Sequence, residues 1–248
     1  CNARDCDSRA AFGGVIVFNT KVDAETSDEI MKSFFEVVAA PQFDEKAIQI
    51  FHDAKRYGVN KDIRLAQFSH LDTLPKFDSD DVKEFIVPRM FADGSVALEI
   101  PFLTSIRSKE NLIFDGAIGD VSVNRIPTQQ EIDDMLIAWY IVMNVRSNGI
   151  VFVKDGTTIS VGTGQQERIG AVEQAIAKAK QKGHSLANSV MASDAFFPSR
   201  DSIDAIAKEN VTAIIYPGGS INDIEIIKAA NEHNIALAIT GERCFAHH

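Results

Sequence analysis

The sequence has few of the residues that mark disulfide-stapled, zinc-binding or membrane-spanning proteins. Its 248 residues include three cysteines, Cys1, Cys6 and Cys244, and no C-x-x-C pair, which is too little for a disulfide framework or a zinc site. No run of eighteen apolar residues occurs, and the start has no basic segment followed by a hydrophobic stretch. We therefore expect a cytoplasmic protein with reduced thiols, no bound metal and no membrane partner.

Positive charge is also scarce. Lys and Arg number 25 against 35 Asp and Glu, so the net charge is -10, and the basic residues are dispersed, which argues against nucleic-acid binding. A hydrophobic content of 45% over 248 residues is enough for one large domain or two small ones. The chain opens at Cys1 without an initiator Met, in polar sequence that leads directly into an apolar run, so we expect further residues upstream.

The first half of the chain predicts a mixture of short elements. Residues 14–18 form an apolar run of strand length, and the spacing of apolar residues over 23–38 predicts a helix. Asp44 is typical of the N-cap of a second helix. The stretch from 57 to 120 has short, strand-like patterns, interrupted by a polar, proline-containing loop at 71–81.

The second half has clearer signals. Thr128 and Glu131 form a capping box ahead of an apolar helix that continues through Met143. An Asp155-Gly156 turn between two apolar runs predicts a hairpin. Strands and helices then alternate, which predicts an α/β fold with helices packed on a mostly parallel sheet. The predicted elements are helix 169–182, strand 190–192, helix 202–209, strand 211–216, helix 223–232 and strand 235–239.

Three turns between strands and helices are candidates for ligand binding. The glycine-rich segment 162–169 enters a helix, where backbone N–H groups and Arg168 suit an anion; Glu167 at the third glycine position excludes a dinucleotide fingerprint. The segment 193–201 carries two adjacent phenylalanines. Either one of them faces a ligand, or both pack at the edge of the sheet. The turn 217–220 directs its N–H groups to the same edge.

These segments, taken together, resemble AICAR transformylase, where AICAR is 5-aminoimidazole-4-carboxamide ribonucleotide. They occur in the order and at the spacing of that family, and the similarity spans nearly the whole chain. The matching motifs are Phe12-Gly13-Gly14, Ser147-Asn148 with Gly162-x-Gly-Gln-x-x-Arg168, Ser193-Asp-Ala-Phe-Phe-Pro, Pro217-Gly-Gly-Ser and Thr240-Gly-Glu-Arg-Cys-Phe245.

The resemblance implies an α/β fold of two cytidine-deaminase-like α/β/α subdomains without their zinc. On this basis residues 1–125 form the first, N-terminally incomplete subdomain and residues 126–248 form the second. The resemblance also implies a cytoplasmic homodimer with sites shared between subunits. Its reaction moves a formyl group from 10-formyltetrahydrofolate, a co-substrate, to the 5-amino group of AICAR in purine (IMP) biosynthesis.

The same resemblance implies two sets of site residues. Arg243 suits an anionic nucleotide, Phe196 offers a flat face to an imidazole, and the amide of Asn148 can both donate to and accept from a carboxamide. The implied AICAR contacts are Gly13, Glu36, Asn148, Phe196 and Arg243. The implied folate contacts are Arg168, Ile169, Asp201, Ser220 and Ile221.

The family's catalytic Lys-His pair is absent, because no Lys-His dipeptide occurs anywhere in the sequence. The catalytic residues of this chain are therefore unknown, and three hypotheses stay open. The first is a formyltransferase whose pair precedes Cys1. The second is a non-catalytic nucleotide- or folate-binding homologue or partner subunit, and the third is a different enzyme on the same fold that uses His70 or another base. We interpret His52, His184 and His233 as surface or helix-terminal residues.

Overall fold

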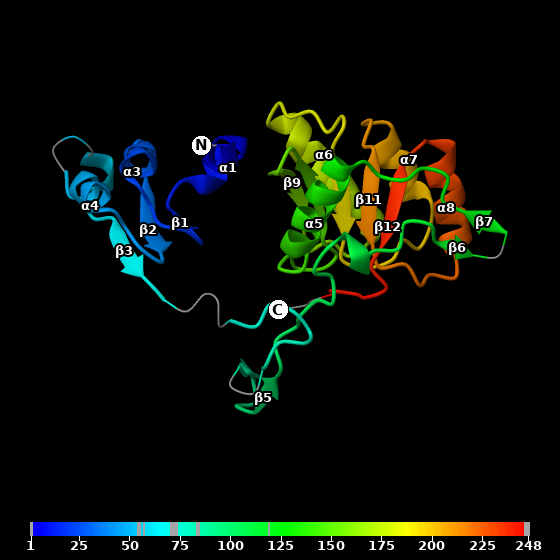
Figure 1. The fold of residues 1–248 in the computed structure, drawn as a ribbon, viewed down its shortest axis with the longest axis horizontal. Coiled ribbons are helices and arrows are strands. Elements are labelled where there is room, and N and C mark those ends of the chain that lie inside the picture. The colour runs from blue at the N-terminus through cyan, green and yellow to red at the C-terminus, as the bar shows by residue number, and fades with distance from the viewer. Residues whose placement is uncertain are drawn as a thin grey trace. The chain divides into compact units, whose positions relative to one another are not determined.

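The computed structural model describes residues 2–53, 56, 58–69, 74–82, 85–118 and 120–245. It divides the chain into two compact units, Cys1–Leu74 and Pro75–His248, which are described separately below (Figure 1). This boundary falls earlier than residue 125. The assignment of residues 1–125 and 126–248 to two subdomains of the family fold stays a prediction.

The first unit is built on a three-stranded parallel sheet in the order β1-β2-β3. Buried side chains of two helices, α3 and α4, pack on one face of this sheet, where Val38, Phe43 and Phe51 belong to a single apolar core. Its elements are α1 (Asn2–Cys6), α2 (Ser8–Ala11), β1 (Gly14–Val17), α3 (Ala24–Met31), β2 (Phe35–Ala40), α4 (Glu45–Phe51), a 3-10 turn (Gly58–Asn60) and β3 (Arg64–Gln67).

The predicted helix over 23–38 is wrong in its second half, because α3 ends at Met31 and Phe35–Ala40 is the central strand of the sheet. The start is as predicted, with the Asp23 side chain accepting from the backbone N–H of Thr26 at 2.8 Å. The buried Asn60 accounts for the break: its amide donates to the carbonyl of Met31 at 3.1 Å, and its oxygen accepts from the N–H of Phe35 at 2.9 Å. A residue distant in sequence thus ends the helix and begins the strand.

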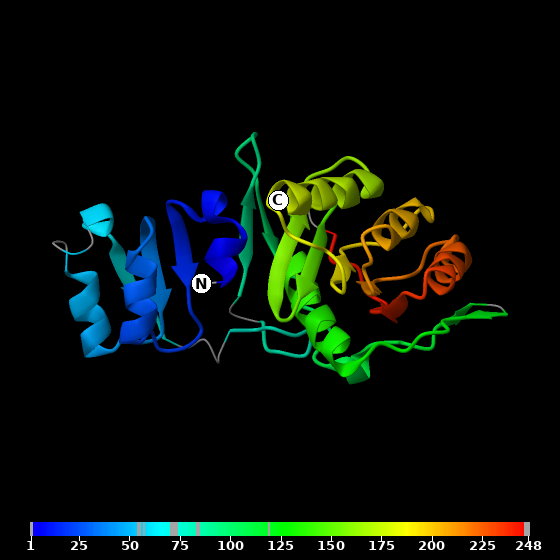
Figure 2. The same ribbon diagram turned by 90° about the horizontal axis from the view of Figure 1, so that it is seen from above.

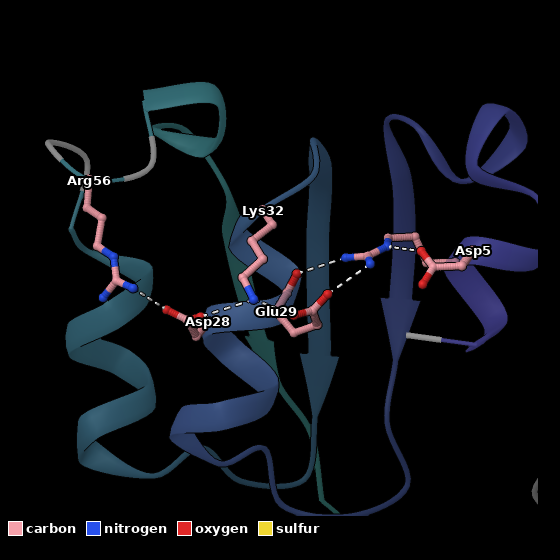
Figure 3. Close-up of polar contacts among 6 residues, drawn as sticks. Asp5, Asp28, Glu29, Lys32 and Arg56 are labelled. Atoms are coloured by element: carbon pink, nitrogen blue, oxygen red, sulfur yellow. Dashed lines mark hydrogen bonds and ion pairs between the residues drawn. The ribbon is translucent and has the colours of Figure 1, made fainter.

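Ion pairs on the surface of the first unit join α1 to α3 and continue along α3 (Figure 3). Arg4 Nη2 lies 2.8 Å from Glu29 Oε1, and Lys32 Nζ lies 2.6 Å from Glu29 Oε2. Arg56 Nη2 lies 2.9 Å from Asp28 Oδ1. Because these groups are largely solvated, each pair contributes little to stability, and the network mainly orients short elements that carry few buried residues.

The second unit contains a five-stranded sheet in the order β12-β11-β10-β8-β9. Strands β10, β11 and β12 are parallel, whereas β8 runs antiparallel to β10 and β9 runs antiparallel to β8. The bounds are β8 (Ile150–Lys154), β9 (Thr157–Gly162), β10 (Val190–Ser193), β11 (Ala213–Tyr216), β12 (Ala236–Ile239), α5 (Gln129–Val142), α6 (Arg168–Gln181), α7 (Asp201–Ala207) and α8 (Asp223–Glu232).

Helices cover both faces of this sheet, which makes three α/β/α layers (Figure 2). The apolar core on one face includes Trp139 and Met135 of α5. The core on the other face includes residues of α6, α7 and α8, such as Val172, Ile203 and Ile226. The predicted α/β class is therefore confirmed.

Local signals in this unit operate as predicted. Thr128 and Glu131 form a reciprocal capping box at the start of α5, and the Asp155-Gly156 turn joins β8 to β9. Gly183, with φ of +75°, follows the end of α6 in the left-handed conformation that glycine adopts readily.

The remainder of the second unit, before α5, has only short elements. They are the hairpin of β4 (Val87–Met90) and β5 (Val96–Glu99), a 3-10 turn (Lys109–Asn111), and the pair β6 (Ala117–Ile118) and β7 (Val121–Ser122). This agrees with the strand-like pattern predicted there. Of the predicted loop at 71–81, residues 71–73 lie outside the described residues, and 74–81 contain no helix. Among the helices that the structure describes, none is long and apolar enough to cross a bilayer.

A charged cluster links α7 to α8. Asp204 accepts two hydrogen bonds of 2.9 Å from Arg200, and its Oδ1 lies 2.8 Å from Nε2 of His233. Arg200 also contacts Glu232 at 2.5 Å. The hydrogen bonds from Arg200, followed by that from His233, lower the pKa of Asp204 from 3.8 to about 2.

Because the folded-state pKa of Asp204 lies below its ordinary value, its contribution to stability is present above pH 3.8 and is lost as the pH falls toward 2. We expect Asp204→Asn to lower the free energy of unfolding modestly at pH 6, and the deficit to vanish near pH 2. Urea unfolding across this range measures it. Asp133→Asn, an exposed position on α5, controls for net charge, and a deficit independent of pH would contradict the prediction.

Candidate functional site

Five turns of the second unit lie at one edge of its sheet. The carboxyl ends of the parallel strands β10, β11 and β12 share an edge. Because β8 is antiparallel to β10 and β9 to β8, the start of β8 and the end of β9 lie at that edge too. In open α/β sheets, ligands usually bind at this position. The turns are residues 147–149, 163–167, 194–200, 217–222 and 240–245.

Asp194 connects three of these five turns with the start of α6. Its side chain is fully buried, and it accepts hydrogen bonds from the N–H of Gly149 at 2.9 Å, from the hydroxyl of Ser147 and from the guanidinium of Arg168. Its backbone carbonyl accepts from the N–H of Cys244 at 3.1 Å. One side chain thereby links the starts of β8 and α6, and its own backbone links the tail.

The Arg168–Asp194 ion pair is excluded from water, with side-chain exposures of 4% and 0%. A buried charge is tolerated only when it is paired and hydrogen-bonded. Arg168 also donates to the carbonyl of Gly149 at 3.2 Å, while its Nε has no partner among the described residues. The expectation that Arg168 stands ready for an external anion in the first helical turn is therefore wrong. Its role as a folate contact stays a prediction.

The two adjacent phenylalanines have different environments. Phe197 is buried, and its ring centroid lies 5.4 Å from that of Tyr216 in the core. Phe196 is half-buried, and the guanidinium carbon of Arg243 lies 4.7 Å from its ring centroid. This distance is typical of a cation–π contact. Two of the predicted AICAR contacts, distant in sequence, are thus brought together.

Asn148 is half-buried in the turn that precedes β8. Its backbone N–H and its Nδ2 donate to the carbonyl of Gln165 at 3.2 and 2.8 Å, which fixes the orientation of the amide. Its Oδ1 has no partner within the part of the chain that the structure describes. The side chain can therefore accept a hydrogen bond from a ligand amide.

The backbone N–H groups of the glycine-rich turns are largely engaged within the protein. Gly219 and Ser220 donate to Oδ2 of Asp223 at 2.6 and 3.0 Å, and Thr163 donates to Oε1 of Gln174 at 2.8 Å. The prediction that these donors serve an anion is wrong at the three positions, because side-chain acceptors nearby already satisfy them.

The remaining predicted folate contacts lie around the same sheet edge. Ile169 is half-buried on α6, and Asp201 is exposed at the start of α7, where it accepts from the N–H of Ser202 at 2.7 Å. Ser220 is half-buried, and Ile221 is 96% exposed. Asn222 joins this turn to the phenylalanine turn through a 2.6 Å hydrogen bond to a backbone carbonyl.

Two predicted AICAR contacts belong to the first unit. Gly13, with φ of +71°, donates its N–H to the carbonyl of Phe34 at 2.9 Å. Glu36 is exposed on β2, and its carboxylate lies 2.8 Å from Arg64. Their roles as ligand contacts stay predictions, and the proposed base His70 lies outside the described residues.

Sequence reasoning missed Asp194 and the neighbouring pair Tyr216 and Asp223 as residues of this edge. Oη of Tyr216 and Oδ1 of Asp223 are buried without a hydrogen-bond partner among the described residues. Burial raises the pKa of both groups, and the charge of Asp223 raises that of Tyr216 further. The available signal was an aspartate directly after a buried strand or beside a glycine turn. No group of three or more potential metal ligands occurs among the described residues.

A three-layer α/β unit with polar, cationic and aromatic groups at the carboxyl edge of its sheet defines a candidate small-ligand-binding α/β protein. The model of the AICARFT/IMPCHase bienzyme family matches residues 1–178, and the chain belongs to this family.

Curated relatives match almost the whole chain. The bifunctional purine biosynthesis protein PurH of Aquifex aeolicus is 40% identical over 245 residues, which are 99% of this chain and 43% of the relative. PurH of Caldicellulosiruptor saccharolyticus is 39% identical over 241 residues, 97% of this chain and 42% of the relative. The chain thus spans less than half the length of these relatives.

Similar solved structures include a diaminohydroxyphosphoribosylaminopyrimidine deaminase/5-amino-6-(5-phosphoribosylamino)uracil reductase from Thermotoga maritima, with a TM-score of 0.32, 21% identity and coverage of 43% of this chain and 34% of that one. The dCMP deaminase of cyanophage S-TIM5 has a TM-score of 0.32, 16% identity and coverage of 45% and 98%. TM-scores this low do not establish a shared fold. The assignment to the α/β class therefore rests on the five-stranded sheet and the helices that cover it.

The unpartnered hydroxyl of Tyr216 generates a stability prediction. Because a buried hydroxyl without a partner costs free energy, we expect Tyr216→Phe to leave the free energy of unfolding unchanged or to raise it by about 1 kcal/mol. Tyr140→Phe is the matched control: its hydroxyl donates to the carbonyl of Ile106 at 2.9 Å, and its loss should cost about 1 kcal/mol. Urea unfolding compares the two, and an equal loss at Tyr216 would contradict the prediction.

Proposed function

We propose that this chain forms part of a formyltransferase of purine (IMP) biosynthesis, which transfers the formyl group of 10-formyltetrahydrofolate to the 5-amino group of AICAR. Membership in the AICARFT/IMPCHase bienzyme family supports the reaction class. The observation that carries the proposal is the contact of Arg243 with the Phe196 ring at the sheet edge. It places a permanent cation beside a flat aromatic face.

The nucleotide fits these groups chemically. A phosphorylated imidazole needs a cation for its anionic part and an apolar face for its ring, which Arg243 and Phe196 supply. Its carboxamide needs an acceptor for the amide N–H, which Oδ1 of Asn148 supplies. The fixed orientation of Asn148 reduces the entropy lost when the ligand binds.

The folate would lie toward the turns that carry Asp201, Ser220 and Ile221. Ile221 is 96% exposed. An aromatic pterin or benzoyl ring that covers this side chain removes apolar surface from water, which favours binding. Asp201 and Ser220 offer acceptors for ring N–H groups. In this proposal Arg168 supports the folate site from the protein interior, because its charge is already paired with Asp194.

The reaction also requires a group that removes a proton from the weakly nucleophilic amine and a group that stabilises the oxyanion on the formyl carbon. The sequence has no Lys-His pair to supply them. In the proposal these groups come from residues other than these 248, and the protein acts as a cytoplasmic homodimer with sites shared between subunits. The same absence favours the second candidate, a homologue or partner subunit that binds nucleotide or folate without turning it over.

The discriminating experiment is an assay of the complete gene product with AICAR and 10-formyltetrahydrofolate, following formylated AICAR by chromatography. We expect turnover that requires both substrates and is lost when either is omitted. Calorimetric titration of AICAR on the same preparation is the control. AICAR binding without product would contradict the formyltransferase and support the binding homologue.

The acceptor role of Asn148 is tested by Asn148→Ala. We expect a loss of about 1–3 kcal/mol in AICAR binding, because a ligand amide is left without its partner. Asn144→Ala is the control, since the side chain of this exposed asparagine donates to the carbonyl of Tyr140 at 3.0 Å. Calorimetric titration measures both, and an unchanged dissociation constant in Asn148→Ala would remove this residue from the site.

A further inference from the structure

Asp194 is a fully buried carboxylate to which neither the family resemblance nor the proposed reaction gives a role. Both of its oxygens are engaged: Oδ2 accepts from Ser147 and Gly149, and Oδ1 accepts from Arg168. A carboxylate held through both oxygens cannot rotate without breaking charge-assisted hydrogen bonds. The Asp194 carboxylate therefore has a fixed orientation at the sheet edge.

The residues that Asp194 holds just before β8 flank Asn148 on both sides. The hydroxyl of Ser147 and the N–H of Gly149 donate to the same oxygen, and the N–H of Asp194 donates back to the carbonyl of Gly149 at 3.3 Å. A Cβ at Gly149 would stand 3.2 Å from that oxygen, so a larger residue there would crowd the carboxylate. Asn148 thus projects from a short segment that is anchored before and after it.

The other two candidate nucleotide contacts of the second unit are also close to Asp194 along the chain or through a hydrogen bond. Phe196 is two residues beyond it, and Arg243 precedes Cys244, whose N–H donates to the Asp194 carbonyl at 3.1 Å. Asn148, Phe196 and Arg243 are therefore each within two residues of Asp194 or of a group bonded to it.

We propose that Asp194 is the positioning residue of the candidate nucleotide site: paired with Arg168, its carboxylate holds the Ser147–Gly149 segment so that Asn148 meets the carboxamide of AICAR. This role rests on the proposed function. It does not require Asp194 to touch the ligand.

Asp194→Asn tests the proposal. The amide has one accepting oxygen, so in either orientation its NH₂ group faces a donor, the guanidinium of Arg168 or the N–H of Gly149. We expect the dissociation constant for AICAR to rise at least tenfold, measured by calorimetry on the wild-type and variant complete gene product below their melting temperatures.

Asp134→Asn is the matched control for burial and chemistry. Asp134 is 3% exposed and accepts from the N–H groups of Asp155 and Gly156 at 2.9 and 2.7 Å, at the opposite end of β8. We expect this variant to lose stability and to keep its AICAR dissociation constant within twofold of wild type. An equal rise in both variants would show a general effect of destabilisation and overturn the positioning role.

Ser147→Ala is the second variant, because it removes one hydrogen bond and leaves the Arg168–Asp194 pair intact. We expect a two- to fivefold rise in the AICAR dissociation constant even where Asp194→Asn does not fold. Ser160→Ala, which removes a buried hydroxyl bonded to the carbonyl of Ala175, should cause none. Wild-type protein that fails to bind AICAR would remove the proposed function itself, whereas wild-type binding with unchanged affinity in Ser147→Ala and Asp194→Asn would overturn only this proposal.

Discussion

The buried ion pair between Asp194 and Arg168 joins the turn after β10 to the start of α6 at the sheet edge. Removing one partner of such a pair leaves an uncompensated charge and costs about 3–5 kcal/mol, whereas apolar replacement of both is often tolerated. Stability alone therefore gives little reason for charges at this position. Their location, between the start of β8, the start of α6 and the tail, gives them a geometric role, because directional bonds fix turns that apolar packing would leave mobile.

The second unit was predictable from sequence where local chemistry decides structure. The capping box of Thr128 and Glu131 and the Asp155-Gly156 turn each determine a conformation within four residues. The helix predicted over residues 23–38 was wrong in its second half because a distant contact, not local chemistry, decides the structure there. Their apolar spacing fits a helix as well as a buried strand, and the choice depends on Asn60, whose side chain bonds Met31 and Phe35 across more than twenty residues.

The candidate site was predictable only to the level of segments. The motifs identified the turns that gather at one edge, but the partners of individual groups depend on contacts that a sequence does not display. Arg168 was expected to face an anion and instead faces Asp194, 26 residues away. The N–H groups of Gly219 and Ser220 were expected to be available and instead meet Asp223. In each case a buried carboxylate replaced the predicted ligand, because a dry interior demands a counter-group within reach.

These internal partners have a consequence for how such an edge can recognise a ligand. Arg168 is paired with Asp194, and the N–H groups of Gly219 and Ser220 already have an acceptor in Asp223. In the proposed function, the anionic nucleotide therefore meets Arg243, which lies against Phe196. The proposed function assigns nucleotide affinity to Arg243, Phe196 and Asn148 and proton transfer to other groups, so the two properties are physically separable. A family member can therefore retain nucleotide binding after losing catalysis, because the internal network preserves one without the other.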